Sequence, residues 1–421
     1  MKRYDTYKDS GVQWLGHIPG HWKHIPFRRV AFVKSNLVHP ADYMDYSQIA
    51  PDSIEKNSGR ILHWKSVAES NIESDNHLFF KGQILYSKIR PLLNKVAIAP
   101  FDGLCSADMY PIETHQDTKF LLYYMLSSAF LEGVTNATRD RVKMPKINKE
   151  ELGTIELCIP PLSEQRSIVF YLDDKCGKID KMLEGKQKQI ELLAEMKQRI
   201  IADAVTRGLN PDVKMKATNI PWLPEIPEHW EMESLRRFLK IFAEKGHGDK
   251  QLLSVTREQG VIERNTDSKE ENHNFIPEDL SGYKYVQVGD FVINKMKSWQ
   301  GSYGVSEYEG IVSPAYFTCK LQDVDKDFFS TAIRSKIYVS FFARYSKGIR
   351  VDQWDLSPIA LKSIPFALPP LDEQHAIVSY ITGKTSKIDI LTSKLQQEIE
   401  SIKEYKQRLI SDVVTGQIKV S

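Results

Sequence analysis

The sequence has few of the features that mark secreted, membrane-spanning or metal-binding proteins. Its 421 residues include four cysteines, Cys105, Cys158, Cys176 and Cys319. None of them forms a C-x-x-C pair or lies at metal-ligand spacing from histidines, so we expect reduced thiols rather than a disulfide framework. The apolar run at 120–131 is too short to span a bilayer, and the N-terminus lacks the apolar segment of a secretory signal. These absences predict a cytoplasmic protein that does not contact the membrane.

The sequence also lacks the motifs of common catalytic and cofactor sites. It contains no G-x-x-x-x-G-K-[ST] phosphate loop, and "GHGDK" at 246–250 is too short to be one. No glycine-rich cofactor turn follows a strand, and no N-P-P-Y-type motif is present. The carboxylates of "PDSIEK" (51–56) have the wrong spacing for a metal nuclease and fit a solvated loop better. We therefore expect no catalytic residue, no metal site and no bound cofactor on this chain.

The chain is a tandem duplication. Residues 160–206 align without a gap with residues 369–415, and 23 of the 47 aligned residues are identical. Two shorter stretches recur at nearly the same separation: "QWLGHIPGHW" (13–22) with "PWLPEIPEHW" (221–230), and "KGQILYSKIR" (81–90) with "VGDFVINKMK" (288–297). His21 and His229 recur beside tryptophan and proline, where we expect a structural role. Each half therefore has an entry motif, a diverged globular part and a well-matched helical segment.

The duplication predicts four regions and an α+β fold. They are a globular domain over 1–158, a helical region over 159–215, a second globular domain over 216–367 and a second helical region over 368–421. The globular parts mix strand patterns with two apolar segments, 119–133 and 327–343, that we interpret as buried helices. We expect each globular part to be built on a twisted sheet with surface loops.

The two helical regions carry the spacing of a coiled coil. "PPL-EQ" opens each region, and proline and an early glutamate both suit the first turn of a helix. Around Cys176 and Gly177 the apolar pattern weakens, so we expect a break there and a longer helix over about 178–206. The stripe, with alternating spacings of four and three, is Ile179, Leu183, Lys186, Ile190, Leu193, Lys197, Ile200 and Ala204, repeated as Ile388, Thr392, Leu395, Ile399, Ile402, Lys406, Leu409 and Val413. Because each helix alone would expose this stripe, we expect the two helices to pack on each other.

Basic residues recur on what we interpret as strand faces. "QILYSKIR" places Lys88 and Arg90 on one face, and "DFVINKMK" places Lys295 and Lys297 likewise. A solvated strand face is the simple alternative, but recurrence in both halves favours nucleic-acid contact. The net charge of +2 decides nothing, so the positive potential must be local or be supplied partly by partners. The candidate DNA-binding residues are Lys88, Arg90, Asn94, Lys95, Arg139, Arg141, Lys143, Lys295, Lys297, Trp299, Gln300, Tyr303, Lys347 and Arg350.

Taken together, these motifs resemble the specificity subunit of type I restriction-modification systems. The resemblance rests on the two "PPL-EQ…I…KID…KQR-I-D-VT" segments, the two "WL--IP-HW" entries and "NKMKSWQGSYGVSEYEGIVSPAY" (294–316). It covers nearly the whole chain.

The resemblance implies a non-catalytic subunit with two target recognition domains. Each domain would read one half of a split, asymmetric sequence in double-stranded DNA. The helical regions would pair as an intramolecular antiparallel coiled coil, set the gap between the half-sites and dock two modification subunits, which methylate adenine. Two restriction subunits would then join. S-adenosylmethionine, ATP and Mg²⁺ would be used by these partners. One chain would thus imitate a symmetric dimer while reading an asymmetric word.

Two other functions stay open from the residues alone. A coiled-coil adaptor without a nucleic-acid role agrees with the near-neutral charge, but the paired basic stretches oppose it. A nuclease or methyltransferase acting alone is disfavoured by the missing motifs.

Overall fold

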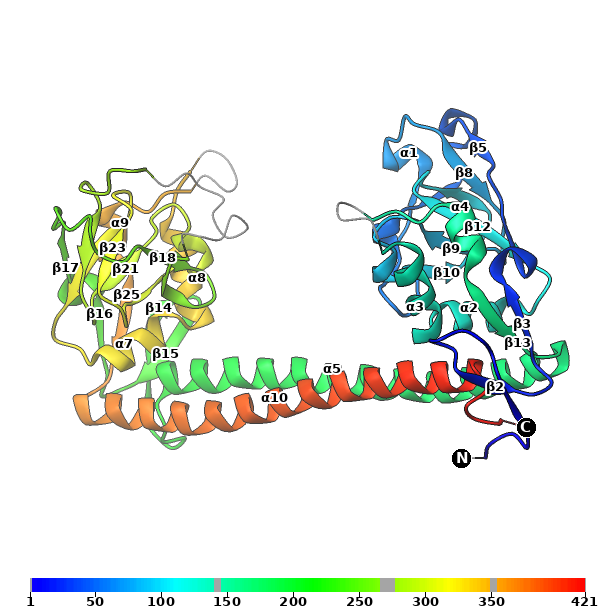
Figure 1. The fold of residues 1–421 in the computed structure, drawn as a ribbon. Helices are drawn as coiled ribbons and strands as arrows, with labels where there is room; N and C mark the ends of the chain where they lie inside the picture. Colours follow the sequence, from blue (N-terminus) through cyan, green and yellow to red (C-terminus); the bar gives the residue numbers. More distant parts are fainter. Residues whose placement is uncertain (1, 140–144, 266–276, 349–353, 421) are drawn as a thin grey trace. The chain divides into compact units, whose positions relative to one another are not determined.

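The structure is a computed structural model that describes residues 2–139, 145–265, 277–348 and 354–420. The chain forms two compact units: a first unit of Met1–Gln187 with Gln396–Ser421, and a second unit of Lys188–Leu395. Each unit combines a globular part with portions of both long helices, α5 (Leu162–Arg207) and α10 (Leu371–Val414), which are labelled in Figure 1.

Among its described residues, the first unit contains a four-stranded sheet, a five-stranded sheet and four short helices. Its strands are β1 (Tyr7–Asp9), β2 (His17–Pro19), β3 (Lys23–Pro26), β4 (Ala31–Val33), β5 (Leu37–Val38), β6 (Ser47–Ile49), β7 (Lys65–Ser66), β8 (Asn76–Phe79), β9 (Ile84–Ser87), β10 (Val96–Ile98), β11 (Gly103–Cys105), β12 (Met109–Thr114) and β13 (Glu156–Ile159). Its helices are α1 (Val67–Ser70), α2 (Thr118–Met125), α3 (Ser128–Ala137) and α4 (Lys149–Thr154), with 3₁₀ turns η1 (Phe27–Arg29), η2 (Pro40–Tyr43), η3 (Pro51–Ser53) and η4 (Pro91–Leu93). The sheets have the orders β10-β9-β12-β4 and β5-β8-β11-β6-β7, and the ladders β1-β2 and β3-β13 accompany them.

The second unit repeats part of this plan. Its strands are β14 (Met215–Ile220), β15 (Leu223–Pro227), β16 (Glu231–Ser234), β17 (Leu239–Phe242), β18 (Leu253–Thr256), β19 (Gly260–Glu263), β20 (Lys284–Val286), β21 (Phe291–Ile293), β22 (Tyr303–Val305), β23 (Gly310–Val312), β24 (Phe317–Leu321) and β25 (Pro365–Leu368). Its helices are α6 (Leu235–Phe238), α7 (Lys326–Ile333), α8 (Lys336–Tyr345), α9 (Pro358–Ser363) and the 3₁₀ turn η5 (Ser298–Gln300). The sheet β17-β24-β21-β22 corresponds to β4-β12-β9-β10, while the ladders β18-β19 and β20-β23 stand where the first unit has its five-stranded sheet. The duplication therefore preserves one sheet and diverges in the other.

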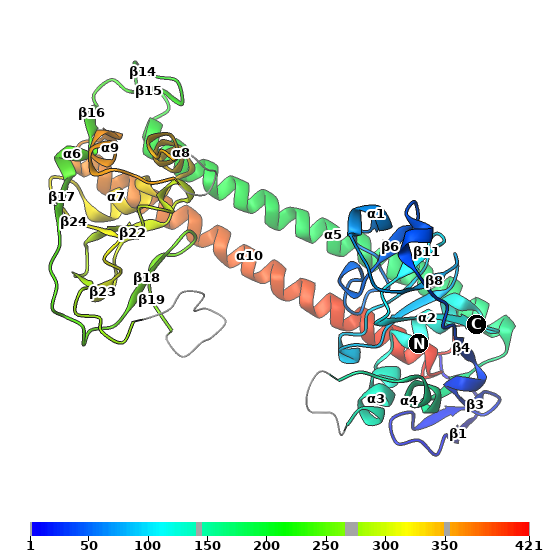
Figure 2. The ribbon, with the colours of Figure 1, turned by 90° about the horizontal axis from the view of Figure 1, so that it is seen from above.

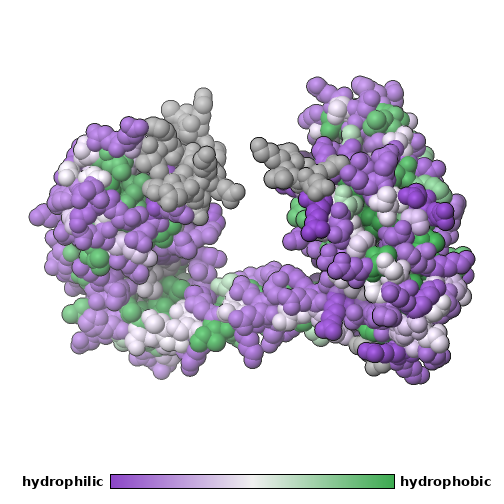
Figure 3. All heavy atoms as spheres, viewed as in Figure 1, coloured by the Kyte–Doolittle hydropathy of each residue, from purple (hydrophilic) through white to green (hydrophobic). Residues whose placement is uncertain are grey.

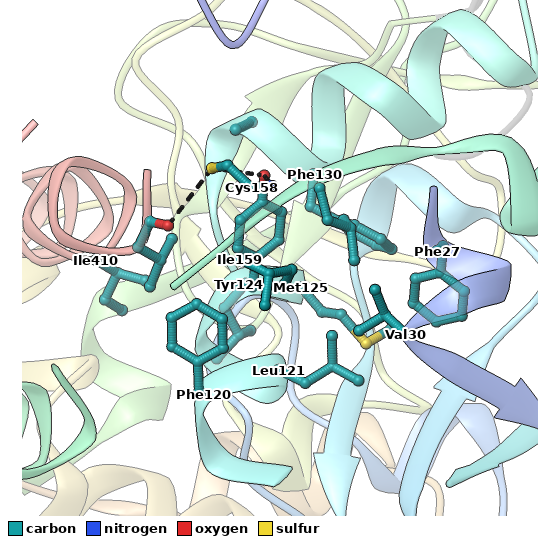
Figure 4. Close-up of a cluster of buried hydrophobic side chains, with 14 of the residues drawn as sticks. Phe27, Val30, Phe120, Leu121, Tyr124, Met125, Phe130, Cys158, Ile159 and Ile410 are labelled. Atoms are coloured by element: carbon teal, nitrogen blue, oxygen red, sulfur yellow. Dashed lines mark hydrogen bonds between the residues drawn. The ribbon is translucent and has the colours of Figure 1, made fainter. Parts of the chain in front are cut away.

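The end of α10 is part of the core of the first unit. In Figure 4, Tyr124 and Cys158 lie beside Ile410 among buried side chains. The Tyr124 hydroxyl accepts a hydrogen bond from the Cys158 backbone N–H at 3.1 Å, and the Cys158 thiol lies 3.8 Å from the Val414 carbonyl oxygen. The second unit repeats the first of these bonds, because the Tyr338 hydroxyl accepts from a backbone N–H of β25. Each buried phenol thus satisfies a donor that would be costly to leave unpaired.

The recurring entry histidines bond to the first turns of the long helices. His21 Nε2 lies 2.8 Å from Glu164 of α5, and His229 Nε2 lies 2.8 Å from Glu373 of α10. The glutamine that follows Glu164 accepts a backbone N–H from the start of α2. These contacts agree with the predicted structural role of the two histidines.

The long helices pack along the predicted stripe and run antiparallel. In the first unit the beginning of α5 faces the end of α10, and in the second unit the end of α5 faces the beginning of α10, as Figures 1 and 2 show. The stripe residues are buried or half-buried, whereas most residues between them are exposed. Inside the first unit Lys406 binds Asp180 at 2.6 Å, and inside the second unit the duplicated pair Lys197–Asp389 lies at 2.7 Å. The predicted α+β fold with an antiparallel coiled coil is confirmed.

The predicted break at Cys176 and Gly177 is wrong, because α5 is one continuous helix. Cys176 is buried against the core of the first unit, as is Leu172 one helical turn earlier, so the apolar face of α5 continues through this position. Among the residues that the structure describes, no other side chain lies within 4 Å of the Cβ position of Gly177. A single helical glycine costs only about 1 kcal/mol. Burial of the thiol raises the pKa of Cys176 to about 11, which keeps it neutral and compatible with the core.

The two segments interpreted as single buried helices each form two helices. Ser127 ends the first run by accepting the Phe130 N–H as an N-cap of α3, and Ser335 occupies the equivalent place before α8. A serine at an N-cap competes with continuation of the preceding helix. Within the described ranges, no helix has the length and apolar character needed to cross a bilayer.

Candidate nucleic-acid interface

The predicted basic strand faces are not strand faces. All four residues of β9 are buried, and so are all three of β21. Both faces of each strand pack: Ile84 and Tyr86 join the main core of the first unit, while Leu85 joins a second cluster. β9 ends before Lys88 and β21 ends before Lys295. The alternating sequence pattern therefore reflects a strand that is buried on both faces, not a strand with one buried and one solvated face.

The basic residues instead follow the strands in loops. Lys88 lies with its ammonium 5.4 Å from the ring centre of Tyr110, and the exposed Arg90 has a left-handed backbone (φ 46°) before η4. Lys95 donates to the Pro51 carbonyl at 2.7 Å. Lys88 and Arg90 therefore lie at the surface of the first unit, while Lys95 is partly engaged in holding the loop.

Two predicted DNA-binding residues belong to the core instead. Asn94 is completely buried, and its amide donates to the Met125 carbonyl at 3.0 Å. Tyr303 is completely buried, stacks on Phe342 at 4.0 Å between ring centres and donates to the Ile333 carbonyl. Neither side chain can reach a nucleic-acid surface in this conformation. Their polar groups serve hydrogen bonds inside the fold, which a sequence pattern cannot distinguish from surface recognition.

The remaining predicted residues divide between exposed loops and side-chain pairs. Arg139 is exposed after α3, and Lys347 is exposed after α8. Lys295 pairs with Asp355 at 3.2 Å. Trp299 packs on Trp354 with ring centres 5.2 Å apart. Three candidates, Arg141, Lys143 and Arg350, lie outside the described residues.

A cationic cavity in the second unit brings predicted and unpredicted residues together. It encloses about 640 Å³ between the β18–β19 hairpin and the turn around η5. The predicted Lys297 and Gln300 line it, together with Arg257, Arg264 and Asn294. The neighbouring strands β18 and β21 are labelled in Figure 1, and β19 is labelled in Figure 2. The sequence reasoning missed both arginines because a hairpin some 40 residues away in the chain supplies them.

Local backbone geometry forms this cavity. Gly301 ends η5 with a φ of 93°, a conformation that favours glycine. Gly260 turns the β18–β19 hairpin with a φ of 77°. The Asn294 amide donates to the Tyr316 hydroxyl at 3.3 Å, and burial raises the pKa of Tyr316, so this phenol stays neutral. The cavity therefore presents fixed polar groups beside three cationic side chains.

This combination of groups suits a nucleic acid. Arginine and lysine neutralise phosphates, while asparagine, glutamine and arginine form the paired hydrogen bonds that distinguish base edges. In the first unit, Lys146 pairs with Asp108 at 3.1 Å, and the Lys88 backbone N–H donates to the Asp108 carbonyl oxygen. In the second unit, Lys295 pairs with Asp355 beside the cavity residue Lys297.

Comparison with known proteins shows which family this chain resembles. A family model described as "Type I restriction modification DNA specificity domain" matches residues 30–192. The specificity subunit of the type I restriction enzyme EcoDI from Escherichia coli is 38% identical over 206 residues, which cover 47% of this chain and 46% of that relative. The match therefore spans about half the length of that relative. The MjaVIII specificity subunit from Methanocaldococcus jannaschii is 27% identical over 340 residues, covering 76% of this chain and 75% of that one.

A solved structure supports the fold along the whole chain. Its title is "Structural basis underlying complex assembly and conformational transition of the type I R-M system", and one chain in it matches with a TM-score of 0.67 at 16% identity, over 95% of this chain and 99% of that chain. At this identity the likeness concerns the fold alone. The matched domain, the named relatives and the duplicated organisation agree, and this chain is similar to the type I restriction-modification specificity subunits.

Proposed function

We propose that this chain recognises DNA for a type I restriction-modification complex and performs no chemistry itself. The observation that carries the proposal is the uneven divergence of the duplication. The helical segments keep 23 of 47 residues, whereas the globular parts differ in their second sheet. Matched helices suit two identical partners, and unlike globular parts suit two different half-words.

The cavity of the second unit supports the DNA-reading part of the proposal. Lys297 and Arg257 supply positive charge, and Gln300 supplies an amide that can pair with a base edge. In the first unit, Lys88 and Arg90 are the corresponding candidates. Each unit would contact one half of a bipartite, asymmetric target.

The proposed partners supply what the chain lacks. Two modification subunits would dock on the paired helices and methylate adenine with S-adenosylmethionine, and two restriction subunits would join them and use ATP and Mg²⁺. Their positively charged surfaces would also add phosphate contacts, which explains how a chain with a net charge of only +2 acts on DNA.

A domain exchange tests the proposal. Residues 216–367 are replaced by the corresponding domain of another specificity subunit, and methylated adenines are mapped by sequencing in cells that also carry the modification subunit. One half of the methylated word should change while the other half stays. The reciprocal exchange of residues 1–158 should change only the other half. A change of both halves in either exchange contradicts the modular arrangement.

A further inference from the structure

A half-buried arginine binds three backbone carbonyls in the second unit. The visible surface of this unit is mainly hydrophilic, as Figure 3 shows, but Arg334, directly after α7, is withdrawn in part from solvent. Its Nη1 donates to the Tyr303 carbonyl oxygen of β22 at 2.6 Å. Its Nη2 donates to the carbonyl oxygens of Glu258 at 2.6 Å and Arg257 at 3.3 Å. The guanidinium therefore joins β22 to the turn between β18 and β19.

Arginine is the side chain that suits this set of partners. In the part of the chain that the structure describes, the guanidinium of Arg334 bonds to these carbonyl oxygens and not to a carboxylate. Burial lowers the pKa of Arg334 below its ordinary value, yet arginine stays protonated in proteins. Its planar fork with five N–H donors can hold several carbonyls at once, which the single ammonium of a lysine cannot. Partial burial of a charge is costly, so packing alone does not account for an arginine here.

The first unit lacks this arrangement at the duplicated positions. The residues just before the N-cap serines of α3 and α8 are duplicates of each other, and they are Leu126 in the first unit and Arg334 in the second. Leu126 is buried in the core. Because β10 corresponds to β22, the duplicate of Gly304 is Ala97. The arginine and the glycine thus belong to the part of the fold in which the two units differ, together with the β18–β19 hairpin.

Two glycines make room for the guanidinium. Gly260 of the hairpin has a φ of 77°, and a Cβ at this position would lie 2.9 Å from Nη1 of Arg334. A Cβ on Gly304 of β22 would lie 3.2 Å from the Cα of Gly260. The hairpin and β22 therefore approach as closely as glycine allows. The Tyr303 hydroxyl in turn donates to the Ile333 carbonyl at 3.0 Å, which fixes the backbone directly before Arg334.

The same hairpin forms one wall of the cationic cavity. Arg257 follows β18 and Arg264 follows β19, and both line the cavity opposite Lys297 and Gln300. β18, β19, β22 and α7 are labelled in Figure 2. Among the described residues that line the cavity, Arg334 does not occur. It binds the backbone of the hairpin that carries the lining arginines.

We propose that Arg334 is a positioning residue, which fixes the β18–β19 hairpin against β22 so that the side chain of Arg257 meets the half-word that the second unit reads. Its three carbonyl bonds hold the backbone at Arg257 and Glu258, and a backbone held in place lowers the cost of ordering the side chain on binding. The guanidinium of Arg334 is occupied by the carbonyls and contacts no DNA. This inference rests on the proposed function and adds a residue that acts from behind the reading surface.

DNA affinity of the full chain, assembled with the modification subunit of its own system, tests the inference. One probe is a duplex that carries the word mapped by methylation sequencing, and the other is the same duplex with the half-word of the second unit scrambled. Arg334→Leu installs the residue of the first unit, and Arg334→Lys keeps the charge without the fork. Arg344→Leu is the matched control, because Arg344 belongs to the same unit and lies 4.1 Å from the ring centre of Trp222.

Arg334→Leu should weaken binding to the intact word by about tenfold, the weight of one arginine contact to a base. Its affinity for the scrambled duplex should stay within about twofold of the unchanged complex, because Arg334 neutralises no phosphate. Arg334→Lys should be as weak as Arg334→Leu, and Arg344→Leu should bind like the unchanged complex. Full rescue by lysine, or undiminished affinity of Arg334→Leu for the word, would overturn the inference.

A double-mutant cycle with Arg257→Ala separates positioning from general stability. Once Arg257→Ala has removed the side chain that Arg334 positions, Arg334→Leu should cost at most about a further twofold in affinity for the word. The same tenfold loss with and without Arg257→Ala would overturn the inference, because independent effects multiply in affinity.

Gly260→Ala covers the case in which Arg334→Leu does not fold, because the added Cβ displaces the guanidinium and leaves α7 unchanged. This variant should also bind the word about tenfold more weakly, and undiminished affinity would contradict the positioning role. The unchanged complex tests the proposed function separately. If it bound the word and the scrambled duplex equally, the proposed function itself would fail, whereas a preference for the word that Arg334→Leu retains in full would overturn the inference alone.

Discussion

Replacing Asn94 separates a structural role from the DNA contact that its sequence position suggested. The residue is completely buried, donates to the Met125 carbonyl at 3.0 Å and adopts a left-handed backbone with a φ of 44°. Asparagine tolerates this backbone region better than alanine does, and its amide adds a hydrogen bond. Two substitutions distinguish the two contributions: Asn94→Gly removes the amide alone, and Asn94→Ala removes the amide and strains the backbone.

The expected destabilisation differs between the two variants. Loss of the hydrogen bond from the Asn94 side-chain amide to Met125 costs about 1 kcal/mol of the free energy of unfolding. The side-chain oxygen Oδ1 of Asn94 already lacks a partner among the described residues, so its loss adds nothing. Alanine in the left-handed region adds about 1–2 kcal/mol. We therefore expect about 1 kcal/mol for Asn94→Gly and about 2–3 kcal/mol for Asn94→Ala.

Hydrogen exchange read by mass spectrometry is the assay, because it resolves the two units of one chain. Peptides of the first unit around η4 and α2 should exchange faster in both variants, and most in Asn94→Ala, while peptides of the second unit act as the internal control. DNA affinity of the assembled complex should be unchanged at temperatures where the first unit stays folded. Unchanged exchange together with weakened DNA binding would refute the structural reading and restore the sequence-based assignment.

Three substitutions and one labelling experiment test other parts of the structure. Lys297→Ala should reduce the slope of log affinity against log salt concentration by about 0.9, so its loss of DNA affinity relative to the unchanged chain should shrink by about 3.5-fold between 50 and 200 mM salt. Gln300→Ala should leave that slope unchanged and alter recognition at one position of one half-word. The reverse pattern would contradict the two assignments. Tyr338→Phe should destabilise the second unit by about 1–3 kcal/mol in denaturant unfolding, because the buried Ala367 N–H loses its acceptor; equal stability would show that the phenol is dispensable. Burial raises the pKa of Cys176 to about 11, so at pH 8 this residue should carry about a hundredfold less thiolate than an ordinary cysteine. Its alkylation should be correspondingly slow, and the rate should rise as the pH approaches 11. Alkylation as fast as that of a free thiol would contradict the burial.

The coiled coil was predictable because its signal is periodic and local. Positions from Ile179 to Ala204, and their duplicates, alternate at the spacing that a helix pair requires, and the structure buries them accordingly. The predicted helix break at Cys176 and Gly177 is wrong because the prediction did not count cysteine as an apolar residue of the helix. In the structure the thiol behaves as a small apolar side chain and packs against the core.

The candidate interface was predictable only in part, because surface exposure depends on what packs on each face. Arg90 and its duplicate Lys297 are both exposed. Asn94 and Tyr303 follow the same motifs closely in the chain and are buried. Residues that turn inward and outward over a few positions of an irregular loop have no periodicity from which burial could be predicted.

By itself the sequence determined the duplication, the α+β class and the helix stripe, since identity between the two halves and apolar spacing are properties of the chain alone. Tertiary structure decided which residues share a surface. Only folding brings the β18–β19 hairpin to Lys297 and Gln300 around one cavity, and only folding pairs Asp180 of α5 with Lys406 of α10. The physical reason is that such contacts join residues far apart in the chain, and their geometry is set by packing and ion pairing rather than by local conformational preference.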